Sequence, residues 1–122
     1  QGHILLVDDE SPIVDYCRFM LERLGYTVSG HVTSTGALAE FKADPDRFDA
    51  VITDMTMPGI MGDELAARIR EERNDIPVII CTGFSERINR EKAMKEGISA
   101  VLDKPVPRAV LAGFLKKVLN PG

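Results

Sequence analysis

The chain has 122 residues, which is the length of one domain, since single domains usually contain about 100 to 150 residues. Its 44% hydrophobic and 28% charged residues are typical of a folded globular protein and exclude disordered and fibrous classes. Fifteen Lys and Arg residues against nineteen Asp and Glu residues give a net charge of -4. No stretch concentrates the basic residues, so we expect no direct contact with nucleic acid.

The apolar runs are short. The longest, at 77–81 and 4–7, fall far below the roughly 20 residues that cross a bilayer, so we expect no membrane insertion and a cytoplasmic location. Cys17 and Cys81 each lie in an apolar pattern without CxxC spacing, which favours buried reduced thiols over a disulfide. We expect the domain to span residues 3–120, either as a whole protein or as a part cut from a longer one.

Apolar or β-branched runs alternate with amphipathic segments along the whole chain. The runs predict strands at 4–7, 26–29, 50–53, 78–81 and 100–102. The segments predict helices at 11–24, 35–43, 63–72, 86–96 and 107–119, with Ser85 as a candidate cap of the fourth. The apolar stripe of the first helix is predicted at Ile13, Val14, Cys17, Leu21 and Leu24, and that of the last at Val110, Leu111, Phe114, Leu115 and Val118.

Five strand–helix pairs predict an α/β fold. Right-handed crossovers then give a single doubly wound domain with a five-stranded parallel sheet, in the flavodoxin-like order 2-1-3-4-5. The second strand alternates more between polar and apolar residues than the others, which favours an edge position.

Chemically active side chains collect at the predicted strand ends. These are Asp8, Asp9 and Glu10 after the first strand, Asp54 after the third, Thr82 after the fourth and Lys104 after the fifth. In such a sheet the ligand lies beyond the carboxyl ends of the strands, so these groups converge on one rim. Clustered carboxylates repel one another unless a cation neutralises them, and oxygen ligands favour Mg²⁺. Each acid alone is typical of a solvated turn, whereas all of them at one rim predict a site. His3 and His31 share no ligand spacing and are interpreted as surface or strand-end residues.

Together these residues resemble the receiver domain of two-component response regulators, over essentially the whole chain. By position, Asp8 and Asp9 resemble the family's acidic metal-binding pair, Asp54 its phosphoacceptor, Thr82 its switch hydroxyl, and Lys104-Pro105 its lysine followed by a cis-peptide proline. A chemotaxis receiver is itself an example of the 2-1-3-4-5 order, so the resemblance and the strand order are not independent.

The resemblance implies a phosphorelay function. Asp54 would accept a phosphoryl group from a phosphohistidine on a sensor histidine kinase or a histidine phosphotransfer protein. Mg²⁺ would be held by Asp8, Asp9, Asp54 and the backbone carbonyl of Thr56, while Lys104 would hold a phosphoryl oxygen. Thr82 would then move toward the phosphoryl group and repack the face formed by the fourth helix, fifth strand and fifth helix. Beyond its own phosphorylation and dephosphorylation, no enzymatic activity is expected.

One position departs from the family pattern. Three residues before the lysine the family commonly carries Tyr or Phe, but this chain has Val101, so coupling between Thr82 and the output face is in question. The run 81–86, with Val101 downstream, resembles the receivers attached to hybrid sensor histidine kinases. A free-standing receiver and a hybrid-kinase receiver both stay open.

Three other functions fit the sequence less well. A phosphohydrolase of the haloacid dehalogenase type needs Asp-x-Asp, but Glu10 stands two residues after Asp8, and 122 residues leave little room for a cap. A phosphorylation-independent protein-interaction module, that is a degenerate receiver, is disfavoured because the full set of site residues is present. A flavin-binding protein would need a phosphate-binding loop after the first strand, which the sequence lacks.

Overall fold

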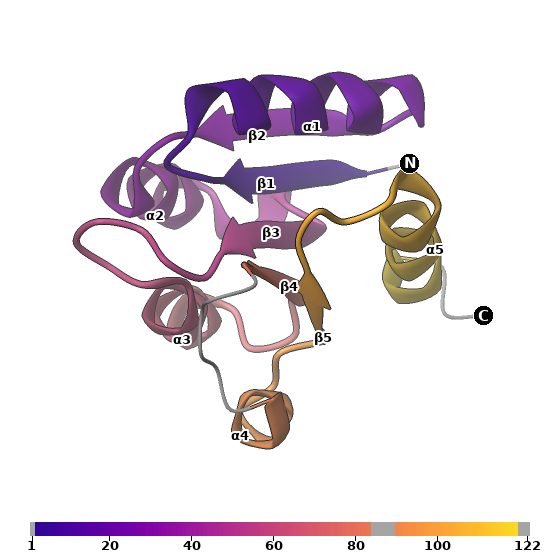
Figure 1. Cartoon of the computed structure of the whole chain (residues 1–122). Coiled ribbons are helices and arrows are strands. Elements are labelled where there is room, and N and C mark those ends of the chain that lie inside the picture. The colour runs from indigo at the N-terminus through magenta and orange to yellow at the C-terminus, as the bar shows by residue number, and fades with distance from the viewer. Residues whose placement is uncertain (1, 84–89, 120–122) are drawn as a thin grey trace.

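In the part of the chain that the structure describes, five parallel strands form one central sheet, and strand alternates with helix (Figure 1). This computed structural model describes residues 2–83 and 90–119. The strands are β1 (His3–Val7), β2 (Thr27–His31), β3 (Ala50–Asp54), β4 (Val78–Thr82) and β5 (Ala100–Asp103). The helices are α1 (Ser11–Arg23), α2 (Ser34–Ala43), α3 (Gly62–Glu72), α4 (Arg90–Lys95) and α5 (Arg108–Leu119), with a short 3-10 helix η1 (Pro45–Arg47) after α2.

The strand order is β2-β1-β3-β4-β5, with all neighbouring strands parallel. This confirms the predicted doubly wound sheet and the edge position of the second strand. The order reverses between β1 and β3, so their carboxyl ends flank the crevice in which such sheets bind ligands.

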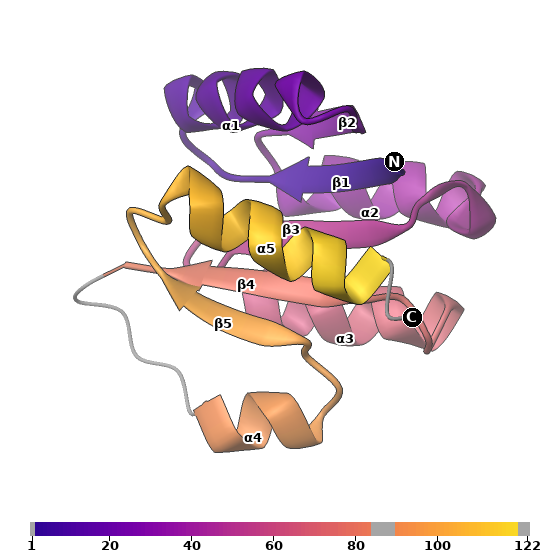
Figure 2. The same cartoon turned by 90° about the vertical axis from the view of Figure 1, so that its right-hand side faces the viewer.

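The helices cover the sheet in two layers. Figure 2 shows α5 in front of the sheet and α2 and α3 behind it, with α1 on the same side as α5. The α1–α5 core contains Ile4 and Leu6 of β1 with Ala50 and Ile52 of β3, whereas Leu5, Val7 and Val51 belong to the core under α2, α3 and α4. Side chains of a strand alternate between its two faces, so Asp8 and Asp54 continue the rows that face α1 and α5.

Local sequence explains the limits of α1. Pro12 lies in its first turn, where the missing backbone N–H has no helical partner to lose. Beyond the last turn, Gly25 has a φ of 100°, in the left-handed region that glycine adopts without strain. Within the described residues, no helix is long and apolar enough to span a membrane.

The predicted elements lie where the structure has them, with boundaries shifted by one or two residues. The fourth helix differs more: it is described over Arg90–Lys95, and its predicted start and the Ser85 cap lie outside the described residues. Two predicted stripe residues are wrong as core residues, because Ile13 is 36% exposed and Val110 is 41% exposed. Both lie at the margin of their helical stripes, and Met20 is buried on α1 instead.

Candidate functional site

Asp8 and Asp54 lie side by side at the carboxyl edge of the sheet. Val7 pairs with Thr53 in the β1–β3 register, so the next residue on each strand is an aspartate. Both side chains are buried, with 4% of Asp8 and 5% of Asp54 exposed. Two buried carboxylates at one place repel each other and lose hydration, so the pair needs a nearby cation.

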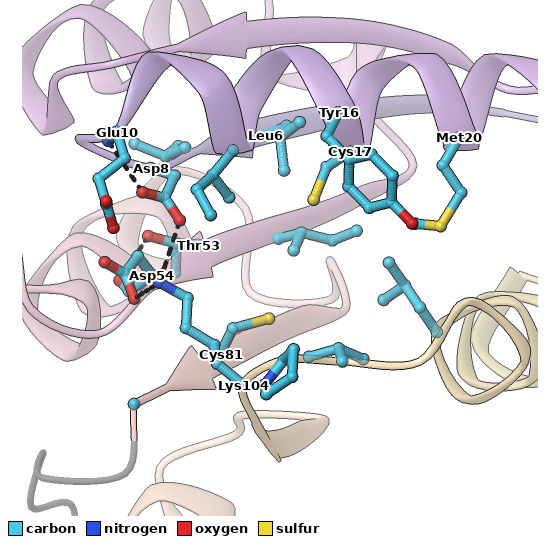
Figure 3. Close-up of a pocket in the computed structure, with 17 residues that line it drawn as sticks. Leu6, Asp8, Glu10, Tyr16, Cys17, Met20, Thr53, Asp54, Cys81 and Lys104 are labelled. Atoms are coloured by element: carbon cyan, nitrogen blue, oxygen red, sulfur yellow. Dashed lines mark hydrogen bonds and ion pairs between the residues drawn. The ribbon is translucent and has the colours of Figure 1, made fainter.

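Lys104 supplies that cation. Its Nζ lies 2.9 Å from Oδ1 of Asp54 and 3.2 Å from Oδ2 of Asp8 (Figure 3). The backbone holds it in place, because Lys104 N–H donates to the carbonyl of Thr82 at 2.8 Å. The Lys104–Pro105 peptide is cis. Partial burial disfavours the charged form, but the hydrogen bond to Asp54 and the charges of both aspartates outweigh it and raise the pKa of Lys104 above its usual range.

Backbone groups orient the two carboxylates. Glu10 N–H donates to Oδ1 of Asp8 at 2.9 Å, and Met55 N–H donates to Oδ1 of Asp54 at 3.0 Å. The Asp8 N–H in turn donates to the carbonyl of His31 at 3.1 Å, which fixes the end of β1 against β2. Backbone N–H groups therefore orient both carboxylates, in addition to their contacts with the side chain of Lys104.

A cluster of three acids lies beside this pair. Carboxylate oxygens of Asp8, Asp9 and Glu10 lie within 4.8 Å of one another, with Asp8 buried and the other two exposed. Carboxylate oxygens are hard donors, which is the ligand type that Mg²⁺ prefers, so this donor set fits the ion. The sequence prediction did not assign Glu10 to the metal, although three consecutive acids at a strand end were the signal for it.

The loop after β3 is held close to Asp54. Gly62 N–H donates to the carbonyl of Met55 at 2.7 Å, and a Cβ on Gly62 would lie 2.2 Å from the carbonyl oxygen of Asp54. Glycine is therefore required where α3 begins. Ser34 Oγ donates to the carbonyl of Ile60 at 2.6 Å, which ties the loop to α2. Thr56, whose carbonyl was predicted as a metal ligand, lies in this loop two residues after Asp54 with its side chain exposed.

Thr82 and Val101 belong to the other side of the sheet. Thr82 is buried at the end of β4, and its hydroxyl donates to the carbonyl of Gly83 at 3.4 Å. Val101 is partly buried and packs against the core under α2, α3 and α4. The predicted switch hydroxyl and the unusual valine therefore adjoin the same helical layer, one at a strand end and one within β5.

The two histidines lie at strand ends, and the two cysteines differ in burial. His3 begins β1 and His31 ends β2, so both are strand-end residues as predicted. Both cysteines are free thiols; Cys81 is buried, whereas Cys17 is only partly buried, which corrects its predicted burial. The reason is that Cys17 faces a cavity between α1 and α5.

Comparison with known proteins identifies the family of this chain. The family model of the response regulator receiver domain matches residues 4–116. The chain belongs to this family. Among solved structures, a response regulator receiver domain protein from Clostridium thermocellum is 36% identical, with a TM-score of 0.94 over 99% of this chain and 96% of that one.

Curated relatives of this receiver domain are longer proteins. The transcriptional regulatory protein CseB of Streptomyces coelicolor is 32% identical over 98% of this chain and 50% of its own length. The transcriptional regulatory protein FixJ of Bradyrhizobium diazoefficiens is 33% identical over 98% of this chain and 58% of its own length. The receiver domain thus spans about half the length of these relatives, and the expected absence of nucleic-acid contact concerns the domain alone.

Proposed function

We propose that this receiver domain accepts a phosphoryl group on Asp54 from a phosphohistidine. The observation that carries the proposal is the pairing of the buried Asp54 carboxylate with Lys104, beside the acidic cluster at the same rim. A nucleophilic carboxylate, a cation for the phosphoryl oxygens and oxygen ligands for a metal are then all within one site.

In the proposed reaction a carboxylate oxygen of Asp54 attacks phosphorus, while the bond from phosphorus to the donor imidazole nitrogen breaks. The products are an acyl phosphate on Asp54 and a free histidine on the donor, which keeps the electron pair of the broken bond. Phosphoryl transfer depends mainly on positioning and charge neutralisation. Lys104 serves both needs, because its ammonium already contacts Asp54 and can pair with an incoming phosphoryl oxygen.

Mg²⁺ is proposed as the cofactor, held by Asp8, Asp9 and Asp54 with the backbone carbonyl of Thr56. When bound, it supplies positive charge that offsets the repulsion between the phosphoryl oxygens and the acids. The three-acid cluster supports a cation here, and it adds Glu10 as a nearby carboxylate.

The proposed donor is a sensor histidine kinase or a histidine phosphotransfer protein. Thr82 and the surface formed by α4, β5 and α5 are proposed to carry the output. Val101 has no aromatic ring whose rotamer could change on phosphorylation. We therefore infer that the response to phosphorylation depends on Thr82 and on packing around β5. The rival function, a phosphorylation-independent interaction module, has the same fold but requires no chemistry at Asp54.

Intact mass after incubation with acetyl phosphate distinguishes the two functions. The wild type should gain one phosphoryl adduct only with Mg²⁺, and Asp54→Asn should gain none while keeping its fold. Asp46→Asn, an exposed aspartate in η1, is the matched control and should behave as the wild type. A phosphorylated histidine phosphotransfer protein is the second donor. Absence of an adduct with both donors would contradict the proposal and favour the interaction module.

A further inference from the structure

A cavity of about 420 Å³ lies between α1 and the segment that leads from β5 into α5 (Figure 3). Its floor is the sheet, at Leu6 of β1 and Ile52 of β3. Its walls include Cys17 and Met20 of α1 and Leu111 of α5. One end reaches the rim of the sheet where Asp8, Asp54 and Lys104 lie, so the cavity is continuous with the acidic site.

Small side chains explain why α1 and α5 leave this space. Cys17 packs against the same core as the larger Val14 and Leu21 of α1, and β4 contributes a second cysteine, Cys81, to the lining of the cavity. Burial raises the pKa of both thiols, that of Cys81 to about 12. The thiols therefore stay protonated and behave as small apolar groups.

The charges at the rim define what the cavity can hold. Among the lining residues that the structure describes, Asp8, Glu10 and Asp54 contribute three carboxylates against the single ammonium of Lys104. An anionic ligand would meet an excess of negative charge there, whereas a protonated amine would be attracted. The volume falls within the roughly 300 to 1,000 Å³ of small-molecule pockets, which are largely apolar with a few polar groups.

We propose that this cavity is a binding site for a small molecule with an apolar body and a cationic head. The body lies between Cys17, Met20 and Leu111, and the head lies at the acidic end, toward Glu10. Nothing in phosphoryl transfer itself requires this space. One consequence rests on the proposed function: Asp8 and Asp54 serve both ligands, so Mg²⁺ and the amine should weaken each other's binding to the same degree.

Three probes test the proposed site. Each has a phenyl ring on a four-carbon chain, and they differ in the head group: phenylbutylamine, phenylbutanol and phenylbutyrate. Backbone amide resonances are followed by NMR in the absence of Mg²⁺ and of any phosphoryl donor. The amine should shift the amides of Cys17, Met20 and Leu111 saturably, with a dissociation constant at least about tenfold lower than that of the carboxylate. No saturable shift, shifts confined to other surfaces, or equal binding of amine and carboxylate would overturn the proposal.

Two variants and one control variant locate the binding. Cys17→Phe fills the cavity and should weaken the amine at least about tenfold, whereas Arg18→Phe adds the same ring on the exposed side of α1 and should change nothing. Glu10→Gln removes an exposed carboxylate without touching the core, so it remains informative if Cys17→Phe fails to fold. It should reduce the advantage of the amine over the alcohol, and an unchanged advantage would contradict the proposed position of the head. Because these measurements need neither metal nor phosphorylation, their failure would leave the proposed role of Asp54 unaffected.

Discussion

The Lys104 ammonium bridges two buried carboxylates, at 2.9 Å from Asp54 and 3.2 Å from Asp8. The bridge joins the ends of β1 and β3 to the segment after β5, so three strands are held by one charge. Without the cation, the two acids would remain buried and uncompensated. The charge that is proposed to serve phosphoryl transfer therefore also stabilises the rim of the fold.

Replacing Lys104 with Met should lower the free energy of unfolding at neutral pH by about 1–3 kcal/mol, since breaking a buried ion pair leaves unpaired charges. The raised pKa of Lys104 sets the pH range of the effect. Its contribution is complete below the usual lysine pKa of about 10.4 and is lost as pH rises through the folded-state pKa. Urea unfolding at neutral and alkaline pH measures this. Lys117→Met, at an exposed position of α5, is the control, and equal stability of both variants would refute the bridge.

Magnesium should stabilise the folded domain. A cation that binds only the folded state at tenfold its dissociation constant adds about 1.4 kcal/mol, which raises the melting temperature by a few degrees. Asp9→Asn should reduce this increase, because Asp9 is an exposed member of the acidic cluster and its loss leaves the core intact. Asp46→Asn should keep it. Thermal unfolding with and without MgCl₂ measures the rise in melting temperature. If the Asp9 variant showed the same rise as the wild type, Asp9 would not belong to the metal site.

Much of the site could be predicted because it follows from strand ends. In a parallel sheet the carboxyl ends meet, so Asp8, Asp54 and Lys104 were expected at one rim before any side chain was located. The two-residue period of a strand then assigns Asp8 and Asp54 to the same face, next to α1 and α5. These relationships depend on the backbone alone, which the hydrophobic pattern determines well.

What could not be predicted depends on how the helices pack. Ile13 and Val110 fit the apolar stripes by spacing, but their exposure is decided by the rotation and tilt of α1 and α5 against the sheet. The cavity beside Cys17 also depends on this packing, because the sequence shows the small side chain of Cys17 but not the separation of α1 and α5. The close approach of Gly62 to Asp54 was likewise invisible, because a glycine at a helix start is also typical of an ordinary turn.

Gly62→Ala should be destabilising, because the added Cβ would lie 2.2 Å from the carbonyl oxygen of Asp54 and 2.9 Å from Cα of Met55. Both contacts are with backbone, which must move to relieve them, so a loss of about 1–3 kcal/mol is expected. The displaced residue is Asp54 itself, and phosphorylation by acetyl phosphate should slow as well. Gly113→Ala is the matched control: nothing lies near its Cβ in α5, and alanine there should stabilise by about 0.5–1 kcal/mol. Equal stabilities of the two variants would show that the α3 start tolerates a side chain.

A second polar cluster links β2 to α2 through Glu40. His31 Nε2 lies 2.5 Å from Oε1 of Glu40, and Ser29 Oγ donates to Oε2 at 3.2 Å. Arg47 of η1 pairs with the same carboxylate. Burial alone would raise the pKa of Glu40, but the hydrogen bonds from His31 and Ser29, with the charges of His31 and Arg47, hold it below the usual value.

Glu40→Gln should therefore lower stability by about 1 kcal/mol at neutral pH, because three partners lose a charged acceptor. A depressed carboxyl pKa contributes stability that is present above the unfolded value of about 4.3 and is lost as pH falls through the folded-state pKa. The difference between wild type and variant should thus be constant above the unfolded value and decrease as pH falls below it. Urea unfolding across this range measures it, with Glu72→Gln at the exposed end of α3 as the control. A difference that persisted unchanged at low pH would mean that Glu40 acts through packing and not through its charge.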